Sequence, residues 1–151
     1  DLLQAIRDET EGGSIGVLSG DDLAELLDSA RAVLGSPDMA ELRTPDALLE
    51  VELTGPVAAL GGRIVHGTID RLIVGPERVL AVDYKSNATV PSTPAEVPEG
   101  ILRQMGAYAA LLEQIYPGRQ VETAILWATT GTLMRLPPDM VRAALSTTPI
   151  P

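Results

Sequence analysis

The sequence predicts an α/β domain in which a mixed sheet is flanked by helices. Two apolar runs, Arg63–Val74 and Val79–Tyr84, flank the turn signal Gly75-Pro76-Glu77-Arg78, which predicts an antiparallel hairpin with a four-residue loop. A long segment, Glu99–Tyr116, repeats apolar residues at helical spacing. The resulting order of helix, three strands, helix and strand is typical of α/β proteins with a mixed sheet.

Composition limits the classes to which the protein can belong. The chain has 151 residues and no cysteine, so it is long enough for one domain and cannot use disulfides, thiol catalysis or thiolate metal sites. It contains no apolar run near the ~20 residues of a membrane helix and no signal peptide. Because the sequence starts at Asp1 without Met and ends at Pro151, we expect a fragment of a larger polypeptide. Because neither a membrane helix nor a signal peptide is found, we expect this fragment to be cytoplasmic.

Charge divides the chain into two parts. Residues 1–47 carry eleven acidic and three basic residues, a net of −8, whereas residues 48–151 carry ten acidic and eight basic residues, a net of −2. We therefore expect an acidic, helical N-terminal part over 1–47 and the functional core of the same domain over 48–151. The overall charge of −10 disfavours a nucleic-acid partner, but acids in the core that bind a divalent metal would offset this.

The N-terminal part predicts helices. Leu2–Glu9 reads as a short helical piece and Glu11–Ser19 as a glycine-containing loop. A clear amphipathic helix, Asp22–Leu34, follows and is stopped by Gly35-Ser36-Pro37, and Met39–Leu42 predicts another short turn. The apolar residues that share one stripe of the helix Asp22–Leu34 are Leu23, Leu26, Leu27, Ala30 and Leu34.

From Ala47 onward the pattern changes to that of strands. Leu48–Leu53 and Gly55–Leu60 run toward a tight Gly61-Gly62 turn and form the first arm of a hairpin. Glu50 and Glu52 point to one face. For Glu50, a solvated position and a role in a site are equally open; Glu52 fits a solvated face.

The C-terminal half continues with a long loop, Ser86–Pro98, followed by the helix Glu99–Tyr116. Strands Val121–Ala128 and Leu133–Leu136 and a final helix Pro138–Leu145 complete the domain. The residues that repeat at helical spacing along Glu99–Tyr116 are Ile101, Met105, Tyr108, Leu112 and Ile115.

The central hairpin brings charged residues together. If it closes symmetrically around Pro76-Glu77, Val74 pairs with Val79 and the same register places Asp70 opposite Asp83. Lys85 shares a face with Asp83 because side chains alternate along a strand. Directly opposed like charges are unfavourable on a sheet, so the two carboxylates require a compensating cation. That cation is either Lys85 alone or a metal.

Several motifs occur in order along these elements: Gly67-Thr68-Ile69-Asp70-Arg71-Leu72, Val82-Asp83-Tyr84-Lys85-Ser86-Asn87, Gln104-Met105-Gly106-Ala107-Tyr108, Tyr116-Pro117-Gly118-Arg119 and Leu126-Trp127. With these motifs the chain resembles the PD-(D/E)xK nuclease superfamily, and more closely the C-terminal nuclease domain of AddA and RecB, the helicase–nuclease subunits that process double-strand DNA breaks. The absence of cysteine favours the AddA type. The resemblance spans roughly Leu48 to Leu136 and implies a restriction-endonuclease-like core.

The resemblance also implies site residues. Asp70 and Asp83 would hold Mg²⁺ or Mn²⁺, the Tyr84 backbone carbonyl would add a ligand, and Glu50 would match an acidic residue that often precedes the hairpin. Lys85 would orient or deprotonate the attacking water or stabilise the charged transition state.

Two helix residues, Gln104 and Tyr108, match a Q-x-x-x-Y motif that implies DNA binding or bracing of the site; packing of the helix is the alternative. Outside these motifs, we expect Arg71 to form a buttressing ion pair on the other side of its strand. Trp127 fits the core better than a base-stacking role. His66 would share the face of Asp70, where either a structural or a metal-binding role is open.

The implied function is that of a metal-dependent DNA nuclease, an exonuclease domain, which hydrolyses phosphodiester bonds in a single strand delivered by the helicase part of the parent chain. An AddB-like subunit would be its partner. Two alternatives remain open: a catalytically silent scaffold of the same fold, and a stand-alone nuclease of the superfamily.

Overall fold

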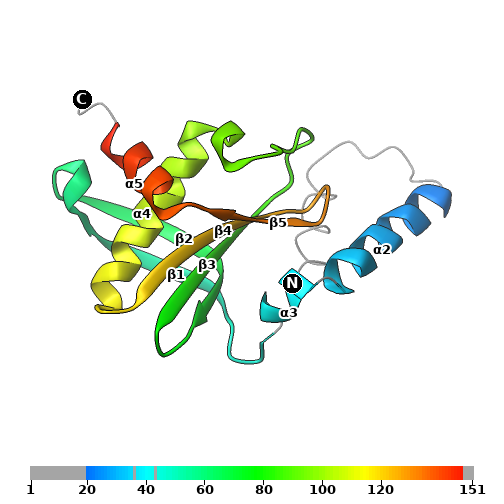
Figure 1. Ribbon diagram of the computed structural model, residues 1–151, viewed down its shortest axis with the longest axis horizontal. Helices are drawn as coiled ribbons and strands as arrows, with labels where there is room; N and C mark the ends of the chain where they lie inside the picture. The colour runs from blue at the N-terminus through cyan, green and yellow to red at the C-terminus, as the bar shows by residue number, and fades with distance from the viewer. Residues whose placement is uncertain (1–19, 36, 43, 148–151) are drawn as a thin grey trace.

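The structure is a computed structural model that describes residues 20–35, 37–42 and 44–147 (Figure 1). The predicted helical piece Leu2–Glu9 and the loop Glu11–Ser19 lie outside the described residues. In the described part of the chain, no helix has the length and hydropathy needed to span a membrane.

A five-stranded mixed sheet forms the centre of the fold, as the sequence predicts. Its strands follow the order β1-β2-β3-β4-β5, and only β3 and β4 are parallel. The strands are β1 (Leu48–Val57), β2 (Arg63–Val74), β3 (Arg78–Lys85), β4 (Gln120–Trp127) and β5 (Thr132–Leu136).

The hairpin of β2 and β3 has the predicted register. Val74 pairs with Val79, and the pairing continues to Arg71 opposite Val82. The connection is one residue shorter than the predicted four, because Arg78 already belongs to β3 and its carbonyl accepts a hydrogen bond of 2.8 Å from the Gly75 N–H.

The preceding hairpin joins β1 to β2 through a 3-10 turn, η1 (Ala58–Leu60), and the predicted glycine pair. Gly61 and Gly62 have φ values of 68° and 78°, a left-handed conformation that glycine adopts without a Cβ clash. The long pairing of β1 with β2 carries Gly67 opposite Leu53 and places the start of β1 beside the end of β2.

Helices α4 (Glu99–Ile115) and α5 (Pro138–Ser146) cover one face of the sheet (Figure 1). Helix α4 is the crossover between the parallel strands β3 and β4, and it packs against α5, β1 and β4. Of its predicted stripe, Met105, Tyr108 and Leu112 are buried. Ile115, the last residue of the helix, has the same helical spacing but is 52% exposed.

The opposite face is covered by the short helix α3 (Pro37–Leu42), whose Leu42 is fully buried. Leu42 packs against a second apolar cluster, made of Leu80, Val82, Ala124 and Leu126. Helix α2 (Gly20–Gly35) extends away from the sheet in Figure 1. Leu23 and Leu27, two residues of its predicted apolar stripe, are 50% and 43% exposed.

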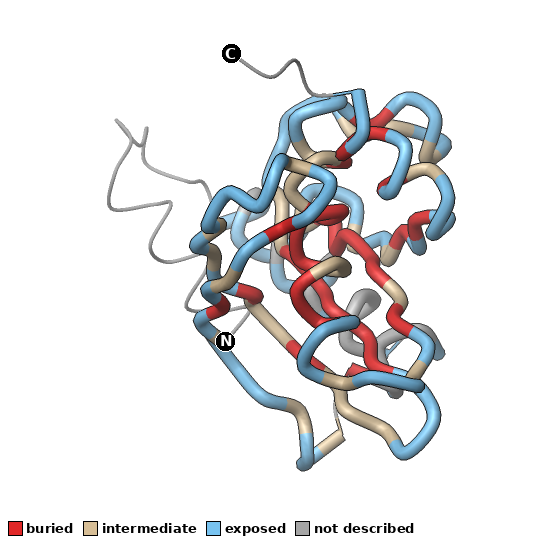
Figure 2. The backbone as a smooth tube through the Cα atoms, turned by 90° about the vertical axis from the view of Figure 1, so that its left-hand side faces the viewer, coloured by how far each residue is buried: buried red, intermediate tan, exposed pale blue. Residues whose placement is uncertain are grey.

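Burial is concentrated in the central strands and in the inner faces of α4 and α5 (Figure 2). The predicted long loop after β3 is present and contains a single 3-10 turn, η2 (Pro94–Glu96). It leads from the end of β3 to the start of α4. The end of β3 therefore lies where the sheet, a long loop and α4 meet, and this is the place of the candidate site.

Candidate active site

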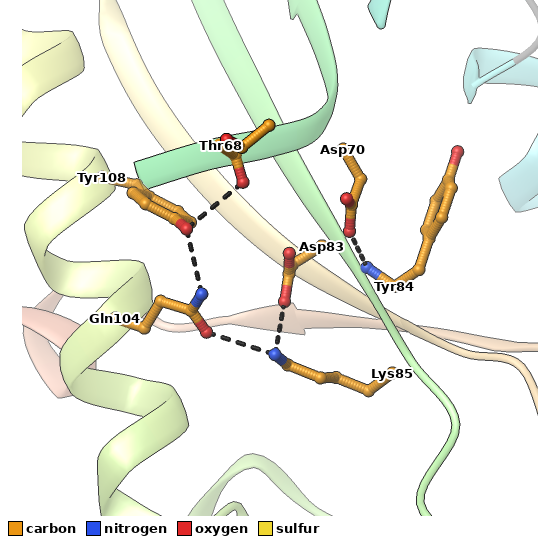
Figure 3. A network of polar contacts seen from close by, with 7 residues as sticks. All are labelled: Thr68, Asp70, Asp83, Tyr84, Lys85, Gln104 and Tyr108. Atoms are coloured by element: carbon orange, nitrogen blue, oxygen red, sulfur yellow. Dashed lines mark hydrogen bonds and ion pairs between the residues drawn. The ribbon is translucent and has the colours of Figure 1, made fainter. Parts of the chain in front are cut away.

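Asp70 lies on β2 one position beyond the last residue that pairs with β3. Its Oδ2 accepts a hydrogen bond of 2.7 Å from the backbone N–H of Tyr84 (Figure 3). The carboxylate thus accepts a hydrogen bond from the main chain of β3, and a hydrogen bond of this kind fixes the orientation of a carboxylate. The predicted register therefore does bring Asp70 to the end of β3.

Asp83 is 5% exposed and lies beside Asp70. Burial raises the pKa of Asp83 from its ordinary 3.8 to about 6, and a hydrogen bond with the Asp70 carboxyl acts in the same direction. The neighbouring Lys85 lowers the pKa without outweighing these effects. Two neighbouring carboxyl groups, one buried and one half-buried, favour a shared proton or a cation between them.

Lys85 provides one such cation. Its Nζ lies 2.8 Å from Asp83 Oδ2 and donates a hydrogen bond of 3.2 Å to Gln104 Oε1 (Figure 3). The group contains one amine and two carboxylates, so a net negative charge remains when all three are ionised.

The Lys85 amine is connected to β2 through helix α4. The Gln104 amide donates a hydrogen bond of 2.9 Å to the Tyr108 hydroxyl, which donates one of 3.2 Å to the Thr68 carbonyl. These bonds form a relay in the order Lys85, Gln104, Tyr108 and Thr68 (Figure 3). In this structure Gln104 and Tyr108 brace the lysine, while Tyr108 also packs in the core at 4% exposure.

The strict alternation of side chains between the two faces of β2 is interrupted between Ile69 and Leu72. Ile69 and Leu72 both belong to the core under α4, although they are three residues apart. Arg71 faces the other side, as predicted, where it lies beside the Tyr84 ring; burial raises the pKa of Tyr84 and Arg71 opposes the rise. The ion pair predicted for Arg71 stays a prediction.

This break changes the expectation for His66. It does not share the face of Asp70 but lies exposed on the outer face of the hairpin of β1 and β2, where its Nδ1 is 3.0 Å from Thr54 Oγ1 in a hydrogen bond. Glu52 and Thr68 line the same shallow groove. The structure therefore gives His66 a place apart from the paired carboxylates.

Glu50 lies on β1 between two residues that pair with Arg71 and Ile69, hence level with Asp70. Its φ of 50° is in the left-handed region, which is strained for a residue other than glycine. The side chain is exposed. Within the described residues, no three His, Cys, Asp or Glu side chains form a group that could hold a metal, so the structure does not bring Glu50 together with Asp70 and Asp83.

The carboxylate oxygens of Asp70 and Asp83 are ligands that suit a hard divalent cation. Mg²⁺ binds proteins through one or two carboxylates and keeps several water ligands. The neighbouring carboxyl groups of Asp70 and Asp83, one of them buried with a raised pKa, supply oxygen ligands and negative charge that a cation would neutralise.

Two contributors to this site had no predicted role. The Thr68 carbonyl anchors the relay, and Gly67 lies directly against the Tyr108 ring. A glycine inside a strand is a known signal of close approach by another group, so the sequence did contain an indication for Gly67.

The sequence pattern of the PD-(D/E)XK nuclease superfamily matches residues 4–144, and the chain belongs to this superfamily. A crystal structure of SSO0001 is similar at 12% sequence identity, covering 99% of this chain and 86% of that chain, with a TM-score of 0.43. No curated protein sequence matches the chain. Membership indicates a hydrolase that acts on nucleic acid and typically uses a divalent metal.

Proposed function

We propose that this chain is a Mg²⁺- or Mn²⁺-dependent deoxyribonuclease, the exonuclease domain of a helicase–nuclease of the AddA or RecB type. The observation that carries the proposal is the grouping of Asp70, Asp83 and Lys85 at the end of β3, with the lysine held by Gln104. An acid pair with an adjacent, braced amine is suited to phosphodiester hydrolysis.

Asp70 and Asp83 would hold the metal, with the Tyr84 backbone carbonyl as a further ligand. When bound, a divalent cation supplies Lewis-acid polarisation of the phosphate and lowers the pKa of a water. The hydrogen bond from the Tyr84 N–H keeps the Asp70 carboxylate oriented while the cluster changes its charge.

Lys85 would act on the reacting groups. Its contact with Asp83 neutralises part of the acid pair, and a divalent cation would take over that task and free the amine. Gln104 Oε1 continues to hold the amine from the other side. Lys85 is then placed to orient or deprotonate the attacking water, or to stabilise negative charge on the phosphate.

The context of a larger protein is the finer part of the proposal. Residues 48–151, the proposed core, have a net charge of only −2, and the acidic residues 1–47 add a net of −8, so most DNA affinity must come from elsewhere. A helicase part of the parent chain would deliver a single strand in the cytoplasm, and an AddB-like subunit would be the partner. Motor motifs upstream in the parent gene would support this context; their absence would favour a stand-alone nuclease.

The test is a calorimetric titration of Mn²⁺ into the 151-residue chain and into Asp83→Asn, followed by cleavage assays on single-stranded DNA. Asp139→Asn is the matched control, because Asp139 is a fully exposed acid on α5. We expect metal binding and cleavage to be lost together in Asp83→Asn and to be kept in Asp139→Asn.

The other outcomes separate the alternatives. Metal binding without cleavage by the wild-type chain requires the same assay on the full parent protein, where absence of cleavage would contradict the nuclease proposal. If neither protein binds Mn²⁺ or cleaves DNA, the silent scaffold becomes the better account.

A further inference from the structure

Gly67 lies on β2 directly against the edge of the Tyr108 ring that carries the hydroxyl group. A Cβ atom at this position would overlap Tyr108 Cε1 and would lie 3.0 Å from both Cζ and the hydroxyl oxygen. Tyr108 is 4% exposed, so its ring is enclosed on the remaining sides. Only a glycine leaves room for this edge of the ring beside the strand.

Helix α4 cannot move away from the strand to relieve such an overlap. Gly106 lies two residues before Tyr108, which on a helix with 3.6 residues per turn is about 200° around the axis. On that opposite side a Cβ at Gly106 would overlap the Val141 carbonyl oxygen of α5. The helix is therefore held at close distance from both neighbours, and a larger residue at position 67 must displace the tyrosine ring.

Displacement of the ring would break the relay that holds Lys85. The Tyr108 hydroxyl donates to the Thr68 carbonyl at 3.2 Å and accepts from the Gln104 amide at 2.9 Å. The same Gln104 side chain accepts the hydrogen bond of 3.2 Å from Lys85. Hydrogen bonds weaken steeply with distance and misalignment, so a movement of the hydroxyl releases Gln104 and, through it, the amine.

We propose that Gly67 is a positioning residue for Lys85: its missing side chain seats Tyr108, which fixes Gln104 and thereby the amine beside Asp83. The catalytic consequence rests on the proposed nuclease function, whereas the seating itself does not. Neither Gly67 nor the Thr68 carbonyl would touch the reacting atoms.

Gly67→Ala and Gly106→Ala form a matched pair for the test. Each introduces one methyl group at a close contact of α4, so both should lower the melting temperature. Because a misplacement of ~1 Å in a catalytic group costs roughly 100-fold, we expect Gly67→Ala to lower kcat for single-stranded DNA cleavage by about that factor. KM should stay unchanged, and Gly106→Ala should keep the wild-type kcat below its melting temperature.

Tyr108→Phe provides a second, milder variant, since it removes only the hydroxyl and adds no bulk. It should lower kcat, and the double variant Gly67→Ala/Tyr108→Phe should be no slower than Gly67→Ala alone. Wild-type kcat in Tyr108→Phe, or an equal loss of kcat in Gly106→Ala, would overturn the proposal. If Gly67→Ala does not fold, kcat of Tyr108→Phe still tests whether the relay through the Tyr108 hydroxyl positions Lys85.

A readout without catalysis separates this proposal from the proposed function. The side-chain amide resonances of Gln104 in an NMR spectrum of the metal-free protein should shift in Gly67→Ala and in Tyr108→Phe, but not in Gly106→Ala. If neither the wild-type chain nor the full parent protein cleaves DNA, the nuclease function is refuted while these shifts still test the seating of Tyr108. Unchanged Gln104 resonances in Gly67→Ala would refute the seating itself.

Discussion

The buried carboxyl of Asp83 makes the stability of the metal-free protein depend on pH in a calculable way. The pKa of Asp83 is about 6 in the folded protein and 3.8 in a chain without structure. Between these values the native state binds more protons than the unfolded state, so the free energy of unfolding falls as the pH rises and levels off above pH 6. A rise of about 2 pKa units corresponds to about 3 kcal/mol in total.

Asp83→Asn removes this titration while keeping the shape of the side chain. Replacing the protonated carboxyl group by an amide shifts the whole stability curve of the variant by a constant, whereas the titration of Asp83, which includes its ion pair with Lys85, changes the slope. From pH 4.5 to pH 7, the stability of the wild type relative to Asp83→Asn should therefore fall by about 2 kcal/mol.

The assay is urea unfolding at several pH values, in the absence of divalent metal. Fluorescence of Trp127 reports the transition, because it is the only tryptophan and is fully buried. Asp139→Asn, at an exposed position, is the control and should follow the wild type. A difference between wild type and Asp83→Asn that stays constant within about 0.5 kcal/mol would show that Asp83 has an ordinary pKa and would refute the reasoning.

Three further predictions concern residues of different burial. Glu50→Gly should raise the free energy of unfolding by about 1 kcal/mol, because glycine tolerates the φ of 50°; Glu50→Ala, which keeps the strain, should show no gain in denaturant unfolding. Trp127→Ala should cost about 3–5 kcal/mol, since Trp127 is fully buried; a loss below 1 kcal/mol by circular dichroism would contradict its place in the core. Arg142→Ala should cost less than about 1 kcal/mol, because its ion pair of 3.3 Å with Glu113 is exposed; a larger loss in thermal unfolding would contradict this ranking.

Local sequence signals predicted most of the fold. The turn residues around Pro76 and the apolar alternation of its flanking strands were sufficient for the register that pairs Val74 with Val79. The glycine pair before β2 and the proline after α4 likewise mark where elements end. These features depend on neighbours in the chain, which is why they can be read without a structure.

Features that depend on tertiary contacts were predicted less well. Ile115 has helical spacing but lies at the end of α4, and Leu23 and Leu27 lie on a helix that extends away from the sheet. Periodicity shows which residues share a face but not whether another element covers that face.

The same distinction applies to the site. The spacing of Asp70, Asp83 and Lys85 indicated their convergence, and the contacts of Lys85 and of both carboxyl groups agree with it. The face of His66 was predicted from strict alternation, which fails because Ile69 and Leu72 both enter the core. The relay through Gln104 and the strained φ of Glu50 depend on how closely α4 and β1 pack against β2. The spacing of residues along the sequence does not predict this packing.

The most direct test of the account is cleavage of single-stranded DNA by Lys85→Met with saturating Mn²⁺, beside the wild type. Met keeps the length of the side chain and removes the amine, while the carboxyl groups of Asp70 and Asp83 remain. The account predicts that Mn²⁺ still binds in calorimetry and that the cleavage rate falls by about 100-fold or more, the usual contribution of a positioned acid–base group. Cleavage at the wild-type rate by Lys85→Met would contradict the assignment of this cluster as the nuclease site.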